Sequence, residues 1–170
     1  MAVNHAFRLI SRPVGLPARE NFEFVDVPVG EPGPDEVLVR VLYISLDPAM
    51  RGWMNDTRSY IPAVGIGEVM RALGIGRVEE SRHPDFAVGD HVIGLLGLQE
   101  RAVVHGAGLT PVDPDVAPLP VHLSALGMTG LTAYFGLLDI GRPEAGQTVV
   151  ASGAAGAVGA LVGQIAKLKG

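Results

Sequence analysis

Short stretches of alternating or continuous apolar residues fill the first two thirds of the chain, and this pattern predicts strands. The clearest is residues 36–47, "EVLVRVLYISLD", whose β-branched and apolar residues are typical of a strand. The runs "HVIGLLG" (91–97) and "ERAVVHG" (100–106) are shorter and similar. Because turn signals recur about every 8–12 residues, the pattern predicts a mainly β barrel.

The region before this strand predicts an opening strand, a loop and a second strand, "NFEFVDVPV" (21–29). In that second strand we expect Phe22, Phe24, Val27 and Val29 to line an apolar face, with a shift of phase at Val25 and Asp26. Residues 48–78 carry glycines without a helical period. They predict a long irregular excursion that returns to strand near residues 68–81.

The pattern changes from residue 119, where apolar residues recur at helical spacing: Leu123, Leu126, Leu131, Tyr134, Phe135 and Leu138. We expect Gly127 and Gly130 to break this stretch into two helical pieces, since glycine disfavours helix interiors. A final strand is predicted at Thr148 to Ser152. A β region thus gives way to an α/β region, with a hinge near residues 118–125.

Composition narrows the function classes. The 170 residues are 48% hydrophobic and 18% charged, with a formal net charge of −5, which argues against nucleic acid and a membrane surface as partners. No apolar run approaches the roughly 20 residues of a membrane-spanning helix, and the start lacks a signal-peptide pattern. Cysteine is absent, which removes disulfides, thiolate nucleophiles and cysteine zinc sites. We therefore expect a cytoplasmic protein.

The last third of the chain contains a glycine-rich turn between the predicted strand and a helix that starts near Ala157. Its glycines are Gly153, Gly156 and Gly159, whereas the strict dinucleotide fingerprint would place its first glycine at Ala154. A tight turn and exposed N–H groups at the helix start suit phosphates. The alternative is a small-residue turn that only packs the helix closely.

Three stretches together resemble one family: "ISLDPAMRGWM", "LGMTGLTAYFGLLDIGRPEAGQTVVASGAAGAVG" and "VGQIAKLKG". They resemble the zinc-independent branch of the medium-chain dehydrogenase/reductase superfamily. Within it they are most similar to the NADPH-dependent prostaglandin reductase and alkenal/enone double-bond reductase group, which includes leukotriene hydroxydehydrogenase and curcumin reductase. The resemblance covers nearly the whole chain.

The resemblance implies a GroES-like β-barrel catalytic domain at residues 1–122. It also implies linking helices and the first β–α unit of a Rossmann domain at residues 123–170. Family members are about twice as long, so the chain is expected to be the front half of a reductase and to be inactive alone. The implied reaction passes a hydride from NADPH to the β-carbon of an unsaturated ketone or aldehyde. The expected partners are this small molecule and a second copy of the chain.

The resemblance also implies the cofactor contacts. Gly156, Ala157, Val158 and Gly159 would touch the pyrophosphate of NADP(H), and Ala154 and Ala155 would form the wall of the same turn. Met128 and Thr129 would lie near the nicotinamide, with the Thr129 hydroxyl as a partner for the carboxamide. The alternative for Thr129 is a hydroxyl bonded back to its own helix.

One departure from the family pattern concerns the substrate. Many relatives have tyrosine where this chain has Ala49, and alanine has no hydrogen-bonding side chain. Tyr60 and Arg51 are the candidates to contact the substrate in place of this tyrosine. The alternative for Tyr60 is a half-buried structural tyrosine, and the alternative for Arg51 is an ion pair with Asp47. No residue is assigned as catalytic proton donor. The histidines show no metal-site spacing, so no metal is expected.

Two other functions remain open. In the first, the chain alone is a non-catalytic fragment or a GroES-like association module, whose unpaired strand and apolar helix favour dimerisation. In the second, the complete protein is a quinone reductase of the same superfamily. Only the "MTGLTAYFG" block distinguishes this alternative from an enone reductase.

Overall fold

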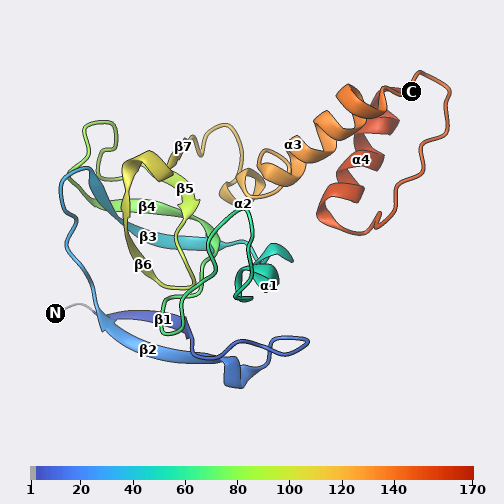
Figure 1. Cartoon of the computed structure of the whole chain (residues 1–170). Helices are drawn as coiled ribbons and strands as arrows, with labels where there is room; N and C mark the ends of the chain where they lie inside the picture. The colour runs from blue at the N-terminus through green and yellow to red at the C-terminus, as the bar shows by residue number, and fades with distance from the viewer. Residues whose placement is uncertain (1–2) are drawn as a thin grey trace. The chain divides into compact units, whose positions relative to one another are not determined.

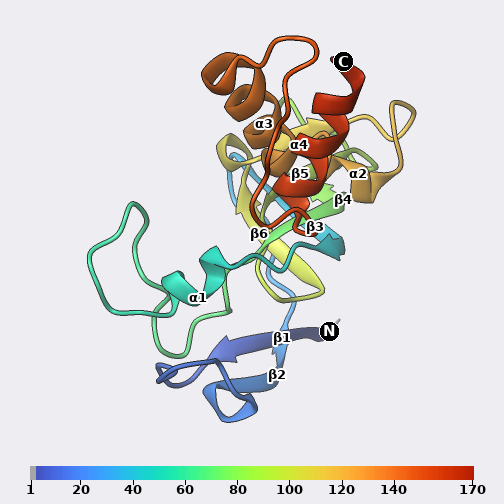
Figure 2. The same cartoon turned by 90° about the vertical axis from the view of Figure 1, so that its right-hand side faces the viewer.

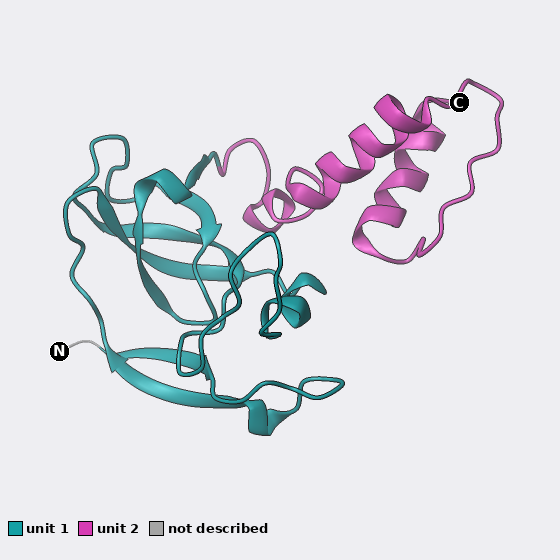
Figure 3. Ribbon diagram, viewed as in Figure 1, with its two compact units in different colours: residues 1–113 teal, residues 114–170 magenta. Residues whose placement is uncertain are grey.

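A computed structural model describes residues 3–170 and divides the chain into two compact units. Unit 1 comprises residues 1–113 and unit 2 comprises residues 114–170 (Figure 3). Unit 1 is mainly β, whereas unit 2 contains the longer helices. The mainly β character predicted for the first two thirds of the chain is therefore confirmed.

Unit 1 is built around a five-stranded antiparallel sheet with the order β6-β3-β4-β5-β7 (Figure 1). Its strands are β3 (Glu36–Ile44), β4 (Leu73–Ser81), β5 (His91–Leu95), β6 (Arg101–His105) and β7 (Thr110–Val112). The predicted strands at residues 36–47, 91–97 and 100–106 correspond to β3, β5 and β6. The short strand β7 was not predicted from the sequence.

A second sheet contains two antiparallel strands, β1 (Val3–Leu9) and β2 (Phe22–Pro28), paired from Val3↔Pro28 to Leu9↔Phe22. A short 3₁₀ turn, η1 (Arg19–Asn21), leads into β2, and another, η2 (Gly106–Gly108), follows β6. Over residues 3–170 the strands form two separate sheets and no closed ring, so the predicted barrel is not confirmed.

The free side of β1 is joined to two segments that lie far away in the sequence. Isolated bridges connect Ala6 to Gln99 and Arg8 to Val69. The buried Asn4 side chain donates to Gln99 Oε1 at 3.1 Å and to the Arg101 carbonyl at 2.9 Å, and accepts from the Arg101 N–H at 2.9 Å. Strand β1 is therefore fixed by two segments of which the nearer, at Val69, already lies far beyond the β1–β2 ribbon, and the other, at Arg101, is 97 positions from Asn4.

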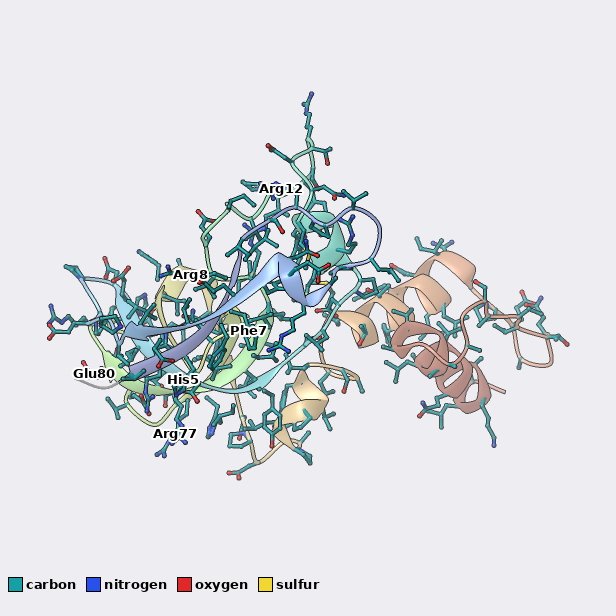
Figure 4. All side chains as sticks on the ribbon, turned by 90° about the horizontal axis from the view of Figure 1, so that it is seen from below. His5, Phe7, Arg8, Arg12, Arg77 and Glu80 are labelled. Atoms are coloured by element: carbon teal, nitrogen blue, oxygen red, sulfur yellow. The ribbon has the colours of Figure 1, made fainter. Side chains whose placement is uncertain are left out.

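The outer face of the β1–β2 ribbon is aromatic. His5 stacks on Phe24 with ring centroids 5.5 Å apart, and Phe7 lies 5.0 Å from the same ring (Figure 4). Phe24 is 58% exposed and lines one hollow with Phe22, whereas Val27 lies on the other face of the strand, so the expectation of one apolar face with Val27 is wrong. The predicted shift of phase at Val25 and Asp26 is also wrong, because β1 and β2 pair in continuous register, and Val25 and Val27 are half-buried on the face opposite to Phe24.

Two buried clusters form the core of unit 1. The first joins strand residues of the five-stranded sheet to two residues of its connecting segments, Phe86 and Leu96; the strand residues are Val37, Val39, Val78, Val92 and Ala102. The second joins β1 to a short helix, α1 (Ala49–Trp53), and to the segment after it: Leu9, Met50, Met54, Val64, Met70 and Ala72. Helix α1 was not predicted, because its five residues are too few to establish a period. Burial of Met50 and Met54 stabilises it instead.

Unit 2 contains α2 (Leu119–His122), α3 (Met128–Phe135), a π-helical stretch η3 (Gly136–Gly141) and α4 (Ala157–Leu168). Gly127 precedes α3 as its N-cap, as expected for a break. Gly130 lies inside α3, so the second predicted break is wrong. A Cβ at Gly130 would overlap the carbonyl of Ala125, and glycine is required there for close packing.

The predicted strand at Thr148 to Ser152 is not formed in the structure. These residues run beside α4, where Val149 and Ala151 line a small hollow with Gly163 and Ala166 of the helix. The described residues offer no neighbouring strand to this segment, and a strand exists only through hydrogen bonds to a partner. The helical half of the predicted β–α unit is present as α4, and the strand half is not.

The division between units falls at Asp113 and Pro114, close to the hinge expected near residues 118–125. The proposed domain boundary between residues 122 and 123 stays a prediction. Among residues 3–170, no helix has both the length and the apolar character needed to cross a membrane.

Candidate functional site

The glycine-rich turn of unit 2 is tight and depends on Gly153. This residue has φ of +61°, a left-handed conformation that glycine adopts without strain. The N–H of Gly156 donates to the carbonyl of Gly153 at 2.8 Å, which closes the turn. Gly153, rather than Ala154, therefore supplies the conformational freedom of the first glycine in a nucleotide-binding turn.

Gly159 lets α4 begin directly against this turn. A Cβ at Gly159 would lie 2.5 Å from the Gly153 carbonyl oxygen and 2.9 Å from Ala154 Cα. Both neighbours are backbone atoms, which cannot rotate away as a flexible side chain can. The absence of a side chain at Gly159 thus fixes the turn on the first turn of the helix.

The start of α4 presents unpaired donors. Gly156 is the N-cap and has no side chain, and the first intrahelical bond runs from the Ala160 N–H to the Gly156 carbonyl at 2.9 Å. The N–H groups of Ala157, Val158 and Gly159 have no hydrogen-bond acceptor among the described residues. Together with the helix dipole, these groups form a site that favours a negatively charged ligand.

The predicted nicotinamide contacts lie at the start of the neighbouring helix. Met128 opens α3 and is 71% exposed. The Thr129 hydroxyl donates to the Ser124 carbonyl at 2.9 Å, so it is bonded to nearby backbone, as in the structural alternative. Its oxygen keeps a lone pair with which to accept a further hydrogen bond.

Helices α3 and α4 pack side by side and run in the same direction, with their first turns at the same end of unit 2 (Figures 1 and 2). The structure therefore brings Met128 and Thr129 to the same end as the glycine-rich turn. The turn residues Ala154, Ala155 and Gly156 are exposed there. All eight residues predicted for the cofactor lie in unit 2.

Arg51 does not pair with Asp47. Its guanidinium donates to the carbonyl oxygens of Gly15 at 2.8 Å and Pro13 at 3.0 Å, and to Asn55 Oδ1 at 2.5 Å. The expected ion pair is therefore wrong, because α1 directs Arg51 to the loop after β1. Arg51 holds this loop against α1.

A second arginine, which sequence reasoning missed, makes the reverse connection. Arg12 lies in the loop after β1 and donates to the carbonyls of Met54 and Val64, both at 2.8 Å (Figure 4). The acceptors follow α1 and stand 42 and 52 positions later. No local sequence signal identifies such contacts, because any backbone carbonyl can accept them.

Tyr60 is not a half-buried structural residue, since 83% of its surface is exposed. Its hydroxyl oxygen accepts a hydrogen bond from Trp53 Nε1 at 3.1 Å. The guanidinium of Arg71 lies over the Trp53 ring, with Cζ 5.6 Å from the ring centroid, and donates to the Pro62 carbonyl at 2.8 Å. Trp53 and Arg71 were not singled out in the sequence.

Ala49 lies at the first position of α1, four residues before Trp53. Over the described range 3–170, no three histidine, aspartate or glutamate side chains converge as a metal site would require. The arrangement thus offers an anion-binding turn in unit 2 and an exposed, supported tyrosine hydroxyl in unit 1.

Comparison with known proteins identifies the family. Residues 5–112 match the family model described as the N-terminal domain of oxidoreductase. The NADPH-dependent curcumin reductase of Escherichia coli is 48% identical over 167 residues, covering 98% of this chain and 48% of that protein. Prostaglandin reductase 1 of Mus musculus is 44% identical over 159 residues, covering 92% of this chain and 46% of that protein.

The fold agrees with the sequence comparison. The crystal structure of CurA from Vibrio vulnificus in complex with NADPH matches with a TM-score of 0.87 and 44% identity. It covers 98% of this chain and 49% of that one. The chain spans about half the length of the relatives that it matches. It belongs to the oxidoreductase family defined by this N-terminal domain, within the medium-chain dehydrogenase/reductase superfamily.

Proposed function

We propose that this chain is the N-terminal part of an NADPH-dependent reductase that saturates the C=C bond of α,β-unsaturated ketones and aldehydes. The observation that carries the proposal is the start of α4, where three N–H groups meet no acceptor among residues 3–170 beside a close-packed glycine turn. The relatives named as curcumin and prostaglandin reductases support the reaction class. The neighbour solved with NADPH supports the cofactor.

The finer architecture belongs to the same proposal. Residues 1–122 form the GroES-like catalytic domain, completed as a barrel in the whole protein. Residues 123–170 form the linking helices and the first β–α unit of a Rossmann domain. Residues 148–152 become a strand there once neighbouring strands supply hydrogen-bond partners.

The cofactor residues act through shape and backbone donors. The N–H groups at the start of α4 bind the pyrophosphate, and Gly159 keeps the turn close to the helix. The residues that hold NADP(H) are Met128, Thr129, Ala154, Ala155, Gly156, Ala157, Val158 and Gly159. Because the Thr129 hydroxyl already donates to Ser124, it accepts a hydrogen bond from the carboxamide N–H rather than donating one.

Bound NADPH would supply the hydride that adds to the β-carbon of the unsaturated carbonyl compound. The chain orients the cofactor and the substrate, and it stabilises the negative charge that forms on the carbonyl oxygen. Arg51 contributes indirectly by fixing the loop after β1, since three of its five N–H groups are held by protein oxygens. Tyr60 is the residue of this chain proposed to contact the substrate.

Two further assignments complete the proposal. The protein is assigned to the cytoplasm. It is also assigned as a homodimer, and the support for this is the set of apolar residues exposed on unit 2, including Leu131, Phe135 and Val150. Its reaction partner is a small unsaturated carbonyl compound. A quinone reductase remains the second candidate activity, since quinones also present a C=C bond conjugated to a carbonyl group.

The test is a calorimetric titration with NADPH and NADH of the chain and of two variants at the N-cap. Gly156→Asp places a carboxylate that caps the free N–H groups and repels phosphate, and aspartate is a good N-cap, so α4 should stay folded. Gly156→Asn has the same size without the charge. We expect the aspartate variant to bind NADPH at least about tenfold more weakly than the asparagine variant.

Equal affinities in the two variants would contradict a role for the α4 start in pyrophosphate binding. No NADPH binding by the unaltered chain would contradict a cofactor site formed by these residues alone. A comparison of NADPH with NADH tests the cofactor preference in the same experiment.

A further inference from the structure

The chain after helix α1 forms a loop whose two ends meet. The N–H of Val64 donates to the carbonyl of Trp53 at 2.8 Å, which joins the end of the loop to its start. We call residues 54–64 the α1 loop, and Met54 and Val64 its neck. Both neck side chains are buried in the second core cluster. The α1 loop is therefore anchored at one narrow base, a shape that is frequent among functional loops.

Between the two ends of its neck, the α1 loop makes few hydrogen bonds. Residues 55–60 are all exposed, and residues 56–61 form no backbone hydrogen bond with any part of residues 3–170. Three side-chain donors reach this part of the loop, and their acceptors are Asn55, Tyr60 and Pro62. The place of the α1 loop, which projects beside α1 in Figure 2, therefore depends largely on its neck.

One side chain from a distant segment closes the neck. Arg12 Nη1 donates to the carbonyls of Met54 and Val64, both at 2.8 Å (Figure 4). A terminal guanidinium nitrogen carries two N–H groups, so one atom serves both acceptors and holds them side by side. A charged donor also makes stronger hydrogen bonds than a neutral one. Because the neck is buried, its carbonyls would otherwise lack partners, which destabilises a folded chain.

Arg12 is itself held against the helix that leads into the α1 loop. The carbonyls of Pro13 and Gly15, which follow it, accept from the guanidinium of Arg51 at 3.0 and 2.8 Å. Arg51 lies in α1. The two arginines thus make reciprocal contacts: Arg51 fixes the segment that carries Arg12, and Arg12 fixes the neck that follows α1.

The location of these bonds separates a positioning role from a general stabilising one. Over residues 3–170, Arg12 donates to two carbonyls, and both belong to the neck. Its removal would leave the hydrogen bonds of the two sheets in place but would free the α1 loop. A loop that is already restrained loses less conformational entropy when a ligand orders it.

We propose that Arg12 is the positioning residue of the α1 loop: by closing the neck, it holds the loop where its exposed residues meet the unsaturated carbonyl compound. The inference rests on the proposed function, in which Tyr60 of this loop contacts the substrate. Arg12 does not touch the substrate and acts only through the neck. Substrate binding then costs less conformational entropy, because the base of the loop is ordered beforehand.

Two substitutions at Arg12 separate its hydrogen bonds from its bulk. Arg12→Met keeps an apolar stem and removes the donors, whereas Arg12→Lys keeps a charged group with three N–H donors. Arg77→Met on β4 is the matched control, because Arg77 donates to a single carbonyl, that of Gly89, at 3.3 Å. The chain has no cysteine, so thiol addition cannot consume an enone probe.

Amide hydrogen exchange, followed by NMR, measures the neck directly. The Val64 amide reports on the neck, and the Val78 amide, which donates to the Asp90 carbonyl at 2.9 Å, reports on the five-stranded sheet. We expect Arg12→Met to speed exchange at Val64 at least about tenfold more than at Val78. Arg12→Lys should restore part of this protection, and Arg77→Met should leave exchange at Val64 unchanged.

Titration with cyclohexenone, a small unsaturated ketone, measures the consequence for the substrate. Arg12→Met should bind it about three- to tenfold more weakly, because the freed loop must be ordered on binding. Arg12→Lys should recover part of this affinity, and Arg77→Met should match the unaltered chain. NADPH affinity should be the same in all variants, since the start of α4 belongs to unit 2.

Each of three results would overturn the inference. An equal change at Val64 and Val78 in Arg12→Met, or none at Val64, would show that Arg12 does not control the neck. Faster exchange at Val64 with unchanged cyclohexenone affinity would show that the neck does not position a substrate-binding loop. No cyclohexenone binding by the unaltered chain would remove the substrate from the α1 loop.

NADPH titration distinguishes this failure from failure of the proposed function. If the unaltered chain binds NADPH while Arg12→Met keeps its full cyclohexenone affinity, the role of Arg12 alone is rejected. If the unaltered chain does not bind NADPH, the proposed function itself is rejected.

Discussion

Alanine substitutions at two glycines of α4 should change the stability of this helix in opposite directions. Gly159 and Gly163 both lie in α4, one turn apart. A Cβ at Gly163 would meet no heavy atom within 4 Å, whereas a Cβ at Gly159 would lie 2.5 Å from the Gly153 carbonyl oxygen. Alanine stabilises a helix by up to about 1 kcal/mol relative to glycine, so Gly163→Ala should stabilise α4 by nearly that amount.

At Gly159 the same gain in helix propensity is opposed by steric overlap with the backbone of the turn. Forcing one extra carbon into a well-packed site typically costs about 1–3 kcal/mol. The net effect of Gly159→Ala is then a destabilisation of roughly 0–2 kcal/mol. The two variants should differ by about 1–3 kcal/mol, although they make the same chemical change in the same helix.

Amide hydrogen exchange across α4, followed by NMR, measures this difference locally. A gap of about 1.4 kcal/mol corresponds to a tenfold difference in exchange rate. We expect faster exchange of the α4 amides in Gly159→Ala and slower exchange in Gly163→Ala. NADPH binding should be lost in the first variant and kept in the second. Equal protection of α4 in both variants would refute the close packing of the turn on the helix.

Three further changes test unit 1. Leu9→Ala removes a side chain with no exposed surface and should destabilise unit 1 by about 2–5 kcal/mol in urea unfolding, whereas Leu95→Ala, at a residue 47% exposed, should cost much less. Arg12→Met leaves two carbonyl groups without their donor and should cost about 1–3 kcal/mol, with the exposed Arg58→Met as control; an equal loss in both would contradict the assigned contacts. Asp26→Asn removes the carboxylate from the exposed pair with His5 and should change the unfolding free energy by less than about 1 kcal/mol. A larger loss would contradict the view that this pair is a weak surface interaction.

The sequence predicted elements whose pattern is local. The continuous apolar run after Glu36 reads directly as β3, and the helical period near Ala157 reads as α4. The glycine spacing also located the exposed turn before α4. These features depend on residues that are adjacent in the sequence, so the sequence alone is enough to predict them.

Features that depend on distant partners could not be predicted. Gly130 looks like a helix breaker until the Ala125 carbonyl beside it is known. Residues 148–152 have strand composition, yet a strand requires a partner that the described chain does not provide. Arg51 was assigned to the nearest carboxylate, because carbonyl acceptors 36 and 38 positions earlier carry no sequence signal.

The long-range attachment of β1 has a consequence for synthesis on the ribosome. Asn4 is synthesised well before its hydrogen-bond partner Arg101, which follows 97 positions later. At about 5–20 residues per second, this interval is roughly 5–20 s. During that time the β1–β2 ribbon can pair with itself while its free edge and the aromatic rings of Phe7 and Phe24 stay exposed. Nascent chains of this protein should therefore be bound by chaperones that recognise extended apolar segments until residue 101 has left the exit tunnel.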